Sequence, residues 1–284
     1  MEFLLGGGSS DSIVSMQLLD GKKAREHYIP LLQKRIKDIS FTPQLAIIQV
    51  SDRSDSNIYI KNKKNLALNL GIKIIHIKLD EKILENEVLD LIQKYNNDKT
   101  IQGIIVQLPL PLHLNSENII NSISPEKDID GLTLNTKFMP ATARGIKELF
   151  DFYNIKLNKK KITIIGRSKL VGKPIAQMCK KEGAIVAVCH SKTENITEKT
   201  RDANILIVAI GKPKFIDEKY VKSDQIVIDV GITRDIEEGL VGDVDFENVK
   251  NIVRMITPVP GGVGQMTVLA LFENLIDACY NLKI

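Results

Sequence analysis

Short apolar runs alternate with amphipathic segments from residue 44 onwards. The apolar run at 44–50 (QLAIIQV) predicts a buried strand, and the segment 55–70 predicts a helix that ends at Gly71. The same pattern predicts a strand at 72–79, a helix at 81–95 and a strand at 103–108, which runs into Pro109 and Pro111. Strands that alternate with helices are typical of a parallel α/β layer.

A second alternation follows a predicted helix at 142–153. It consists of predicted strands at 161–165, 184–189, 205–210, 225–230 and 252–256, with a helix within 172–183. The segment 257–264 (TPVPGGVG) predicts no regular element, and 266–282 has helical periodicity. The two alternations predict two α/β units in one chain.

Composition and charge exclude several classes of protein. The 284 residues favour two domains, and 43% hydrophobic with 26% charged residues argues against disordered, collagen-like and coiled-coil chains. A net charge of +4, spread along the chain, argues against a nucleic-acid partner. No apolar run approaches the roughly 20 residues of a membrane span, so no membrane partner is expected.

The amino terminus and the cysteines indicate the compartment. Residues 1–15 lack the features of a signal or transit peptide and predict a flexible leader, with the folded part starting near Met16. The three cysteines are odd in number and have no metal-binding spacing, so no metal is expected. A reduced, cytoplasmic protein is the simplest interpretation.

The stretch GRSKLVGKP at 166–174 lies between a predicted strand and a predicted helix, where a phosphate-binding turn belongs. Gly166 would allow a tight turn and Gly172 a close backbone approach, and free amides at the helix start can hold a phosphate. The spacing is not G-x-G-x-x-G, so an ordinary turn before a helix remains the alternative.

The end of the next predicted strand indicates which dinucleotide would bind. An NAD-binding unit usually carries Asp or Glu there, but this chain has His190, Ser191 and Lys192. Hydroxyls and a cation, with Arg167 on the neighbouring turn, suit a 2′-phosphate and favour NADP over NAD. A solvated loop is the alternative interpretation.

One lysine of the predicted helix at 55–70 falls on its apolar face. At about 100° per residue, Lys63 lies within the apolar arc, whereas Lys61 and Lys64 point away. Tyr59 precedes Lys63 by four residues on the same face. A desolvated lysine near other cations has a lowered pKa and can act as an acid or base. The alternative is that Lys63 keeps its ammonium in water.

Two further polar residues stand at places that suit a site. Gln107 lies at the carboxyl end of a buried strand, where an amide can orient a substrate or satisfy a loop carbonyl. Asp130 precedes Gly131 in a loop, where Asp is most often a turn former, so a functional role needs further support.

Several stretches together match one known family in the same order along the chain. They are SNIYIKNK at 56–63, GIIVQLPLP at 103–111, PEKDIDG at 125–131, GRSKLVGKP at 166–174, VCHSKT at 188–193, GKP at 211–213, IDVGI at 228–232, GDVDF at 242–246 and TPVPGGVGQMTV at 257–268. On these stretches the chain resembles the bifunctional methylenetetrahydrofolate dehydrogenase/methenyltetrahydrofolate cyclohydrolase family, from about Leu19 to the carboxyl end.

The resemblance implies a two-domain α/β fold with an active-site cleft between the domains. An α/β amino-terminal substrate domain would span 16–145, completed by the carboxyl-terminal helix at 266–284, and a Rossmann-like NADP domain would span 146–265. It also implies a homodimer, formed mainly through the cofactor domain.

The resemblance also implies the reaction. NADP would oxidise 5,10-methylenetetrahydrofolate to 5,10-methenyltetrahydrofolate, and water would then open the ring to give 10-formyltetrahydrofolate. This would be a step of one-carbon metabolism that serves purine biosynthesis.

Roles for individual residues follow by motif. Lys63 would be the catalytic lysine, Tyr59 would stack on the folate, and Gln107 would hydrogen-bond to Lys63 and tune its charge. Asp130 would bind the amino and ring nitrogens of the pterin, since a carboxylate accepts from two N–H donors. The implied cofactor-binding residues are Gly166, Arg167, Ser168, Gly172, Ser191 and Ile232, and Pro260, Gly261 and Gly262 would lie over the folate.

Some positions depart from the family pattern. Leu132 and Thr133 follow Asp130-Gly131 where Phe-His is common, and the segment 135–140 is shorter than expected. Ala141 and Ala143 replace the cysteine and second proline of Pro-Cys-Thr-Pro, and Gln265 stands where proline is usual. An enzyme with only one of the two activities, or a folate- or NADP-binding regulatory protein without turnover, therefore remains an alternative.

Overall fold

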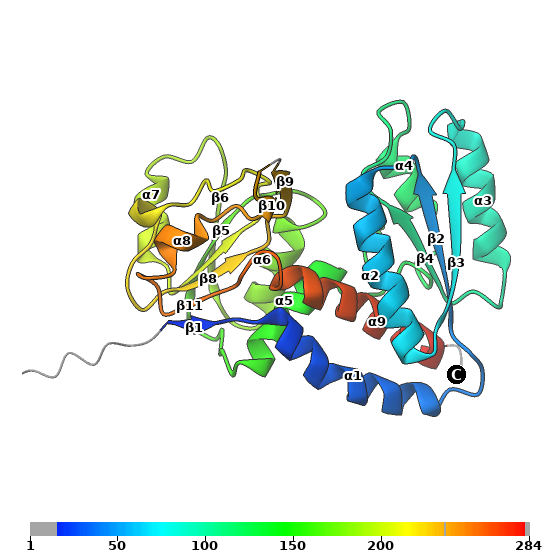
Figure 1. The fold of residues 1–284 in the computed structure, drawn as a ribbon, viewed down its shortest axis with the longest axis horizontal. Helices are drawn as coiled ribbons and strands as arrows, with labels where there is room; N and C mark the ends of the chain where they lie inside the picture. Colours follow the sequence, from blue (N-terminus) through cyan, green and yellow to red (C-terminus); the bar gives the residue numbers. More distant parts are fainter. Residues whose placement is uncertain (1–15, 236, 282–284) are drawn as a thin grey trace, which may run out of the picture.

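The computed structural model describes residues 16–235 and 237–281, so the predicted leader at 1–15 and the predicted helical residues 282–284 lie outside the described residues. The described chain forms two lobes, each built on a parallel sheet, with three long helices running between them (Figure 1). No described helix is long and apolar enough to cross a membrane.

The first lobe contains a three-stranded parallel sheet in the order β3-β2-β4. Its elements are β2 (Gln44–Val50), α2 (Ser54–Leu70), β3 (Lys73–Leu79), α3 (Glu85–Asn97), β4 (Gly103–Gln107) and α4 (Ser116–Asn121). Successive residues of β2 point to opposite faces. Ala46 and Ile48 therefore pack with Val88 and Ile92 of α3, whereas Ile47 packs in the cluster that contains α2.

The second lobe contains a six-stranded sheet in the order β1-β11-β8-β7-β5-β6, with every pair parallel. Its strands are β1 (Gln17–Leu18), β5 (Lys161–Ile165), β6 (Ile185–Cys189), β7 (Ile205–Val208), β8 (Ile226–Asp229) and β11 (Met255–Ile256). Helices α6 (Gly172–Lys181), α7 (Ile196–Asp202) and α8 (Phe246–Val249), a 3₁₀ turn at Glu218–Tyr220 and a hairpin of β9 (Thr233–Asp235) and β10 (Gly239–Val241) complete the lobe. The strand–helix alternation and the parallel sheets predicted from the sequence are confirmed.

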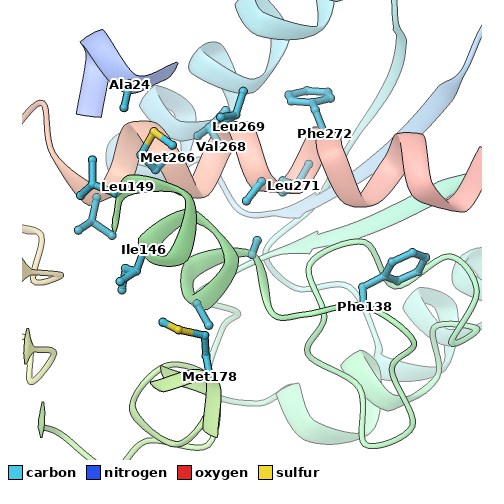
Figure 2. Close-up of a cluster of buried hydrophobic side chains, with 14 of the residues drawn as sticks. Ala24, Phe138, Ile146, Leu149, Met178, Met266, Val268, Leu269, Leu271 and Phe272 are labelled. Atoms are coloured by element: carbon cyan, nitrogen blue, oxygen red, sulfur yellow. The ribbon is translucent and has the colours of Figure 1, made fainter. Parts of the chain in front are cut away.

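Helices α1 (Gly21–Lys37), α5 (Ala141–Phe152) and α9 (Val263–Asn281) join the lobes. Residues of α9 are buried on almost every side, which is typical of a helix inside a core. Figure 2 shows Met266, Leu269 and Phe272 of α9 among side chains from the surrounding helices, including Leu149 of α5. The apolar α9 therefore forms the centre of the molecule.

Several elements differ from the sequence prediction. Helix α9 begins at Val263 rather than at 266, so the prediction of no regular element for 257–264 is wrong for its last two residues. Gly264 belongs to the helix, and a Cβ there would lie 3.1 Å from Ile232 Cδ1. This glycine therefore serves a close approach and does not break the helix. Helix α3 begins at Glu85 rather than 81, after a turn in which Glu87 accepts from the Leu84 amide at 3.0 Å.

The amino-terminal segment crosses between the lobes. The substrate domain was expected to span 16–145, whereas β1 pairs with β11 of the second sheet and α5 runs across the expected boundary. Helix α1 was not predicted, because Pro30 interrupts its sequence and only three of its residues are buried, so its apolar periodicity is weak.

Candidate active site between the lobes

Lys63 is buried on the inner face of α2. Its side chain is 8% exposed, whereas Lys61 and Lys64 are exposed, as the helical periodicity predicts. Lys63 Nζ donates a hydrogen bond to Gln107 Oε1 at 2.9 Å. The alternative of an ammonium held in water is therefore wrong.

The two ionisable groups of the site influence each other. Burial lowers the pKa of Lys63, and the nearby Asp130 carboxylate opposes this by raising it. Burial raises the pKa of Asp130; Lys63 lowers it and Asp128 raises it further. Desolvation is the largest effect on both groups, so both are pushed towards their uncharged forms.

Gln107 is the last residue of β4 and is buried. Its Nε2 donates to the Leu108 carbonyl at 2.9 Å, which turns Oε1 towards Lys63. The amide is therefore oriented by its own strand end and offers Lys63 a fixed acceptor.

Asp130 is held by a loop that Asp128 organises. The buried Asp128 carboxylate accepts from the amides of Gly131, Leu132 and Thr133 at 3.1, 3.2 and 2.8 Å. Gly131 has φ +73°, and a Cβ there would lie 2.7 Å from Pro140 Cα. The turn-forming role predicted for an Asp beside Gly therefore belongs to Asp128, which leaves the Asp130 side chain available to the cavity.

A cavity of about 340 Å³ lies between the lobes and is lined by both. Small-molecule sites typically occupy such clefts, often at domain interfaces. The first lobe contributes Tyr59, Lys63, Leu108, Asp130 and Leu132; the interlobe helices contribute Thr142, Val263, Gly264, Thr267, Val268 and Leu271; and the second lobe contributes Leu170, Val171, Val230 and Ile232.

A second hollow adjoins this cavity and shares Tyr59 and Ile232 with it. Its wall includes the run from Pro258 to Gly264, which contains the predicted residues Pro260, Gly261 and Gly262. Gly261 has φ +111°, a conformation that L side chains rarely adopt. The small residues therefore form a compact wall of the hollow that adjoins the cavity.

The turn at 166–172 folds tightly at the carboxyl end of β5. Gly166 has φ +123°, and Cβ atoms at Gly166 and Gly172 would lie 2.2 Å from Ala209 O and 2.3 Å from Gly166 O. Gly172 thus permits a close approach within the turn itself. Leu170 and Val171 of this turn line the cavity.

Ser168 occupies the amides expected to be free at the start of α6. Its Oγ accepts from the amides of Val171 and Gly172, each at 3.2 Å, and its carbonyl accepts from Lys173 N at 3.0 Å. The prediction that these amides hold a phosphate is therefore not supported in this conformation. Since both lone pairs of Ser168 Oγ are engaged, its exposed hydroxyl is left as a donor.

The end of β6 lies beside this turn. Gly166 N donates to Cys189 O at 3.0 Å, which brings Arg167 and Ser191, both exposed, to the same edge of the sheet. No carboxylate stands at residues 190–193. Cations and hydroxyl donors at this edge match a phosphorylated ribose better than a free 2′-hydroxyl.

Two buried carboxylates lie near the cavity. Asp229 is a crevice-lining candidate from its place at the carboxyl end of a predicted strand, whereas Asp243 was not predicted as a site residue. Asp229 accepts from the amides of Gly231, Asp243 and Val244, and Asp243 accepts from those of Ile210, Gly211 and Lys212. The motifs IDVGI and GDVDF contain both, but their side-chain directions cannot be read from spacing. They hold the loops at the carboxyl ends of β7 and β8, where open α/β sheets bind ligands.

Two family models match the chain on either side of the cavity. The model described as "Tetrahydrofolate dehydrogenase/cyclohydrolase, catalytic domain" matches residues 19–130, and the "NAD(P)-binding domain" model of the same name matches residues 140–283. The chain belongs to the tetrahydrofolate dehydrogenase/cyclohydrolase family. The family that the sequence motifs indicated is thereby confirmed.

Individual relatives of this family cover nearly the whole chain. "Bifunctional protein FolD" of Ligilactobacillus salivarius is 42% identical and covers 92% of this chain and 95% of its own. The FolD methylenetetrahydrofolate dehydrogenase/cyclohydrolase structure from Campylobacter jejuni has 40% identity and a TM-score of 0.90, and the match covers 94% of this chain and 100% of that structure's chain. The Trypanosoma brucei FolD structure, complexed with NADP cofactor and inhibitor, has 28% identity and a TM-score of 0.88, and the match covers 94% of this chain and 98% of that structure's chain. These matches confirm the two-domain α/β fold.

Proposed function

We infer that the chain is a bifunctional, NADP-dependent enzyme of folate metabolism. It oxidises 5,10-methylenetetrahydrofolate to 5,10-methenyltetrahydrofolate and hydrolyses that product to 10-formyltetrahydrofolate. The observation that carries this function is Lys63: a buried lysine, fixed by Gln107, in a cavity that reaches from Asp130 to the dinucleotide turn.

We propose that Lys63 is the catalytic acid–base group of the hydrolytic step. The methenyl substrate carries a positive charge at the reacting carbon, so an ammonium beside it would be unfavourable. The lowered pKa allows Lys63 to be neutral, to take a proton from the attacking water and to return one to the ring nitrogen when the C–N bond opens. The formyl product then leaves with the net release of one proton.

Asp130 and Tyr59 are proposed to hold the substrate. Asp130 lines the cavity with Lys63, and its carboxyl group can accept from the pterin amino and ring N–H groups. Tyr59 lies between the cavity and the adjoining hollow, where its ring can stack on the folate, while Pro260, Gly261 and Gly262 cover that side. This arrangement fixes the reacting carbon near Lys63.

The residues at the second lobe's sheet edge fit NADP. Arg167 and the Ser168 and Ser191 hydroxyls supply cationic and neutral donors for phosphate groups, and the tight approach at Gly166 and Gly172 keeps the turn that carries Arg167 and Ser168 compact. When bound, the nicotinamide accepts the hydride from the substrate methylene. Ile232, which lines both hollows, is proposed to contact the cofactor and to separate its ring from water.

A homodimer formed through the second lobe is proposed. Strand β6 is the edge strand of the six-stranded sheet, and its Ile185 and Val188 side chains are 62% and 38% exposed. An exposed apolar edge strand is a surface that proteins usually cover. A second copy of the same strand is the proposed cover. A cytoplasmic location and a role in purine biosynthesis stay predictions from the sequence.

Assays of both steps on one preparation test this function. We expect the protein to reduce NADP but not NAD when given 5,10-methylenetetrahydrofolate, with little methenyl product accumulating. Reduction of NAD instead would contradict the roles of Arg167 and Ser191. Reduction of NADP with full accumulation of the methenyl product would leave a dehydrogenase alone, and ligand binding without turnover would leave a regulatory protein.

A variant of Lys63 tests its role. Lys63→Met keeps the length and apolar stem of the side chain but removes the titrating amine, and we expect the hydrolysis rate to fall by roughly 10²–10⁴-fold. Lys61→Met removes the same charge from the exposed face of the same helix and is the matched control. Full hydrolase activity in Lys63→Met would overturn the assignment.

A further inference from the structure

A chain of hydrogen bonds links α2 to β3, one of the two edge strands of the first sheet, through contacts other than the one between Lys63 and Gln107. Lys64 Nζ lies 2.9 Å from His76 Nδ1, and His76 Nε2 lies 2.8 Å from Gln49 Oε1. Gln49 Nε2 donates to Asn57 Oδ1 at 2.8 Å, and Asn57 Nδ2 donates to Asp52 Oδ1 at 2.7 Å. This relay, defined as Lys64, His76, Gln49, Asn57 and Asp52, begins and ends on or beside α2.

The chemistry at its two ends fixes every proton in the relay. A carboxylate such as Asp52 only accepts, so Asn57 must offer it the NH₂ group and present its carbonyl to Gln49. Gln49 then presents its own carbonyl to His76, so Nε2 of the ring must carry the proton. At the other end an ammonium such as Lys64 only donates, so Nδ1 must be the unprotonated acceptor. A neutral His76 is the only form that satisfies both neighbours.

The relay and the catalytic lysine hold α2 from two sides. Asn57 and Lys64 are seven residues apart and share one helix face, whereas Lys63 is rotated from Lys64 by about 100°. Lys64 reaches His76 on β3, and Lys63 reaches Gln107 on β4, with β2 between these two strands. Rotation of α2 about its axis would lengthen one of these contacts as it shortened the other. The relay therefore sets the rotation of the helix that carries Tyr59 and Lys63.

We propose that His76 is a positioning residue for the reaction, which, as the neutral centre of this relay, fixes α2 so that Lys63 and Tyr59 face the cavity. The inference rests on the proposed function of Lys63. His76 itself does not line the cavity described above, so it acts through the helix and not on the substrate.

Protonation of His76 would break the relay at Lys64. A proton on Nδ1 would face the Lys64 ammonium, and the second cation nearby is Lys78 of β3, which pairs with Asp52 at 2.6 Å. The other hydrogen-bond partner of the ring, Gln49 of β2, is uncharged. Burial and the two lysines lower the pKa of His76 below its usual 6.5, so the ring stays neutral near pH 7 and titrates only in more acidic solution.

The test compares the pH profile of kcat/KM for the overall reaction in wild type and variants. His76→Leu removes both contacts, and we expect kcat/KM to fall by on the order of 10- to 100-fold at neutral pH, with a raised KM because Tyr59 also shifts. His76→Gln offers one donor and one acceptor without titrating. It should restore kcat/KM at neutral pH, and the decrease of kcat/KM in acid that is due to protonation of His76 should be absent. Lys64→Met should lose activity, and Lys61→Met should not.

Two results would overturn the proposal: wild-type kcat/KM in His76→Leu, or an acid limb in His76→Gln that coincides with that of wild type. Affinity for NADP, whose site lies in the other lobe, is measured in each variant as a control for folding. Failure of the wild-type protein to catalyse either step would reject the proposed function instead, so the two ideas fail separately.

Discussion

At the scale of single residues, the buried carboxylate of Asp229 couples the second lobe to pH. It is 3% exposed, and burial raises its pKa to about 7, with Asp243 adding to the effect and backbone donors opposing it. The unfolded chain has an ordinary pKa near 3.9 for this group. The folded form therefore binds an extra proton between about pH 4 and about pH 7, and the stability due to this group is lost as the pH rises through that range.

The variant Asp229→Asn isolates this effect. We expect the variant to be less stable than wild type in acid, because the NH₂ group of the new side chain must face an amide that donated to the carboxylate, such as Val244 N. The deficit in unfolding free energy relative to wild type should narrow by up to roughly 4 kcal/mol between about pH 4 and about pH 7. Urea denaturation at several pH values measures it, and a deficit that does not change with pH would contradict the prediction.

At the scale of elements, α5 and α9 approach too closely for a side chain at Gly145. A Cβ there would lie 2.6 Å from the carbonyl carbon of Met266. In an ordinary helix Gly→Ala stabilises by up to about 1 kcal/mol. We expect Gly145→Ala to have the opposite sign and to lower the free energy of unfolding by about 2 kcal/mol or more.

Gly71→Ala is the matched control for this prediction. Gly71 ends α2 with φ +70°, and nothing lies within 4 Å of a Cβ placed there. Its substitution should therefore cost only about 1 kcal/mol, from the backbone conformation alone. Chemical denaturation of both variants separates the two contributions, and equal losses would show that contact between α5 and α9 is not limiting.

Hydrophobic periodicity predicted the elements and buried faces that are determined by the local sequence. The strand β2 and the burial of Lys63 against its exposed neighbours follow from repeats of two and about 3.6 residues. Helix α1 could not be predicted in this way, because it has few buried residues, which pack in the cluster that contains α9. The strand β1, which precedes α1, pairs with β11 of the second lobe. The strand end marked Gln107 as a candidate, but motif order was needed to assign roles to Gln107 and to Asp130, whose local pattern indicates only a turn.

The contacts that sequence could not predict depend on side-chain direction. Ser168 covers the amides that the turn sequence presents as free, and Asp128 takes the turn-forming role that Asp130 was expected to have. His76 lies in an apolar strand pattern, where a lone histidine carries no signal. Its importance becomes visible only when β2, β3 and α2 are assembled.

At the scale of the whole molecule, the proposed dimer predicts a change in size. Ile185→Asp places a charge at the exposed apolar residue that begins β6, within the proposed contact, and we expect a monomer of half the mass in solution. Leu84→Asp, at a side chain that is 66% exposed in the first lobe, should remain a dimer. Light scattering coupled to gel filtration measures both, and an unchanged mass for Ile185→Asp would place the interface elsewhere.

The pairing of β1 with β11 joins segments that are synthesised at very different times. Gln17 and Leu18 are among the first described residues to be made, but their partners Met255 and Ile256 follow about 240 residues later, roughly 10–50 s at ordinary rates of translation. Throughout that interval Leu19, fully buried in the finished protein, lacks the strand to which its amide donates. Any product truncated before β11 therefore leaves this amino-terminal edge open to other chains.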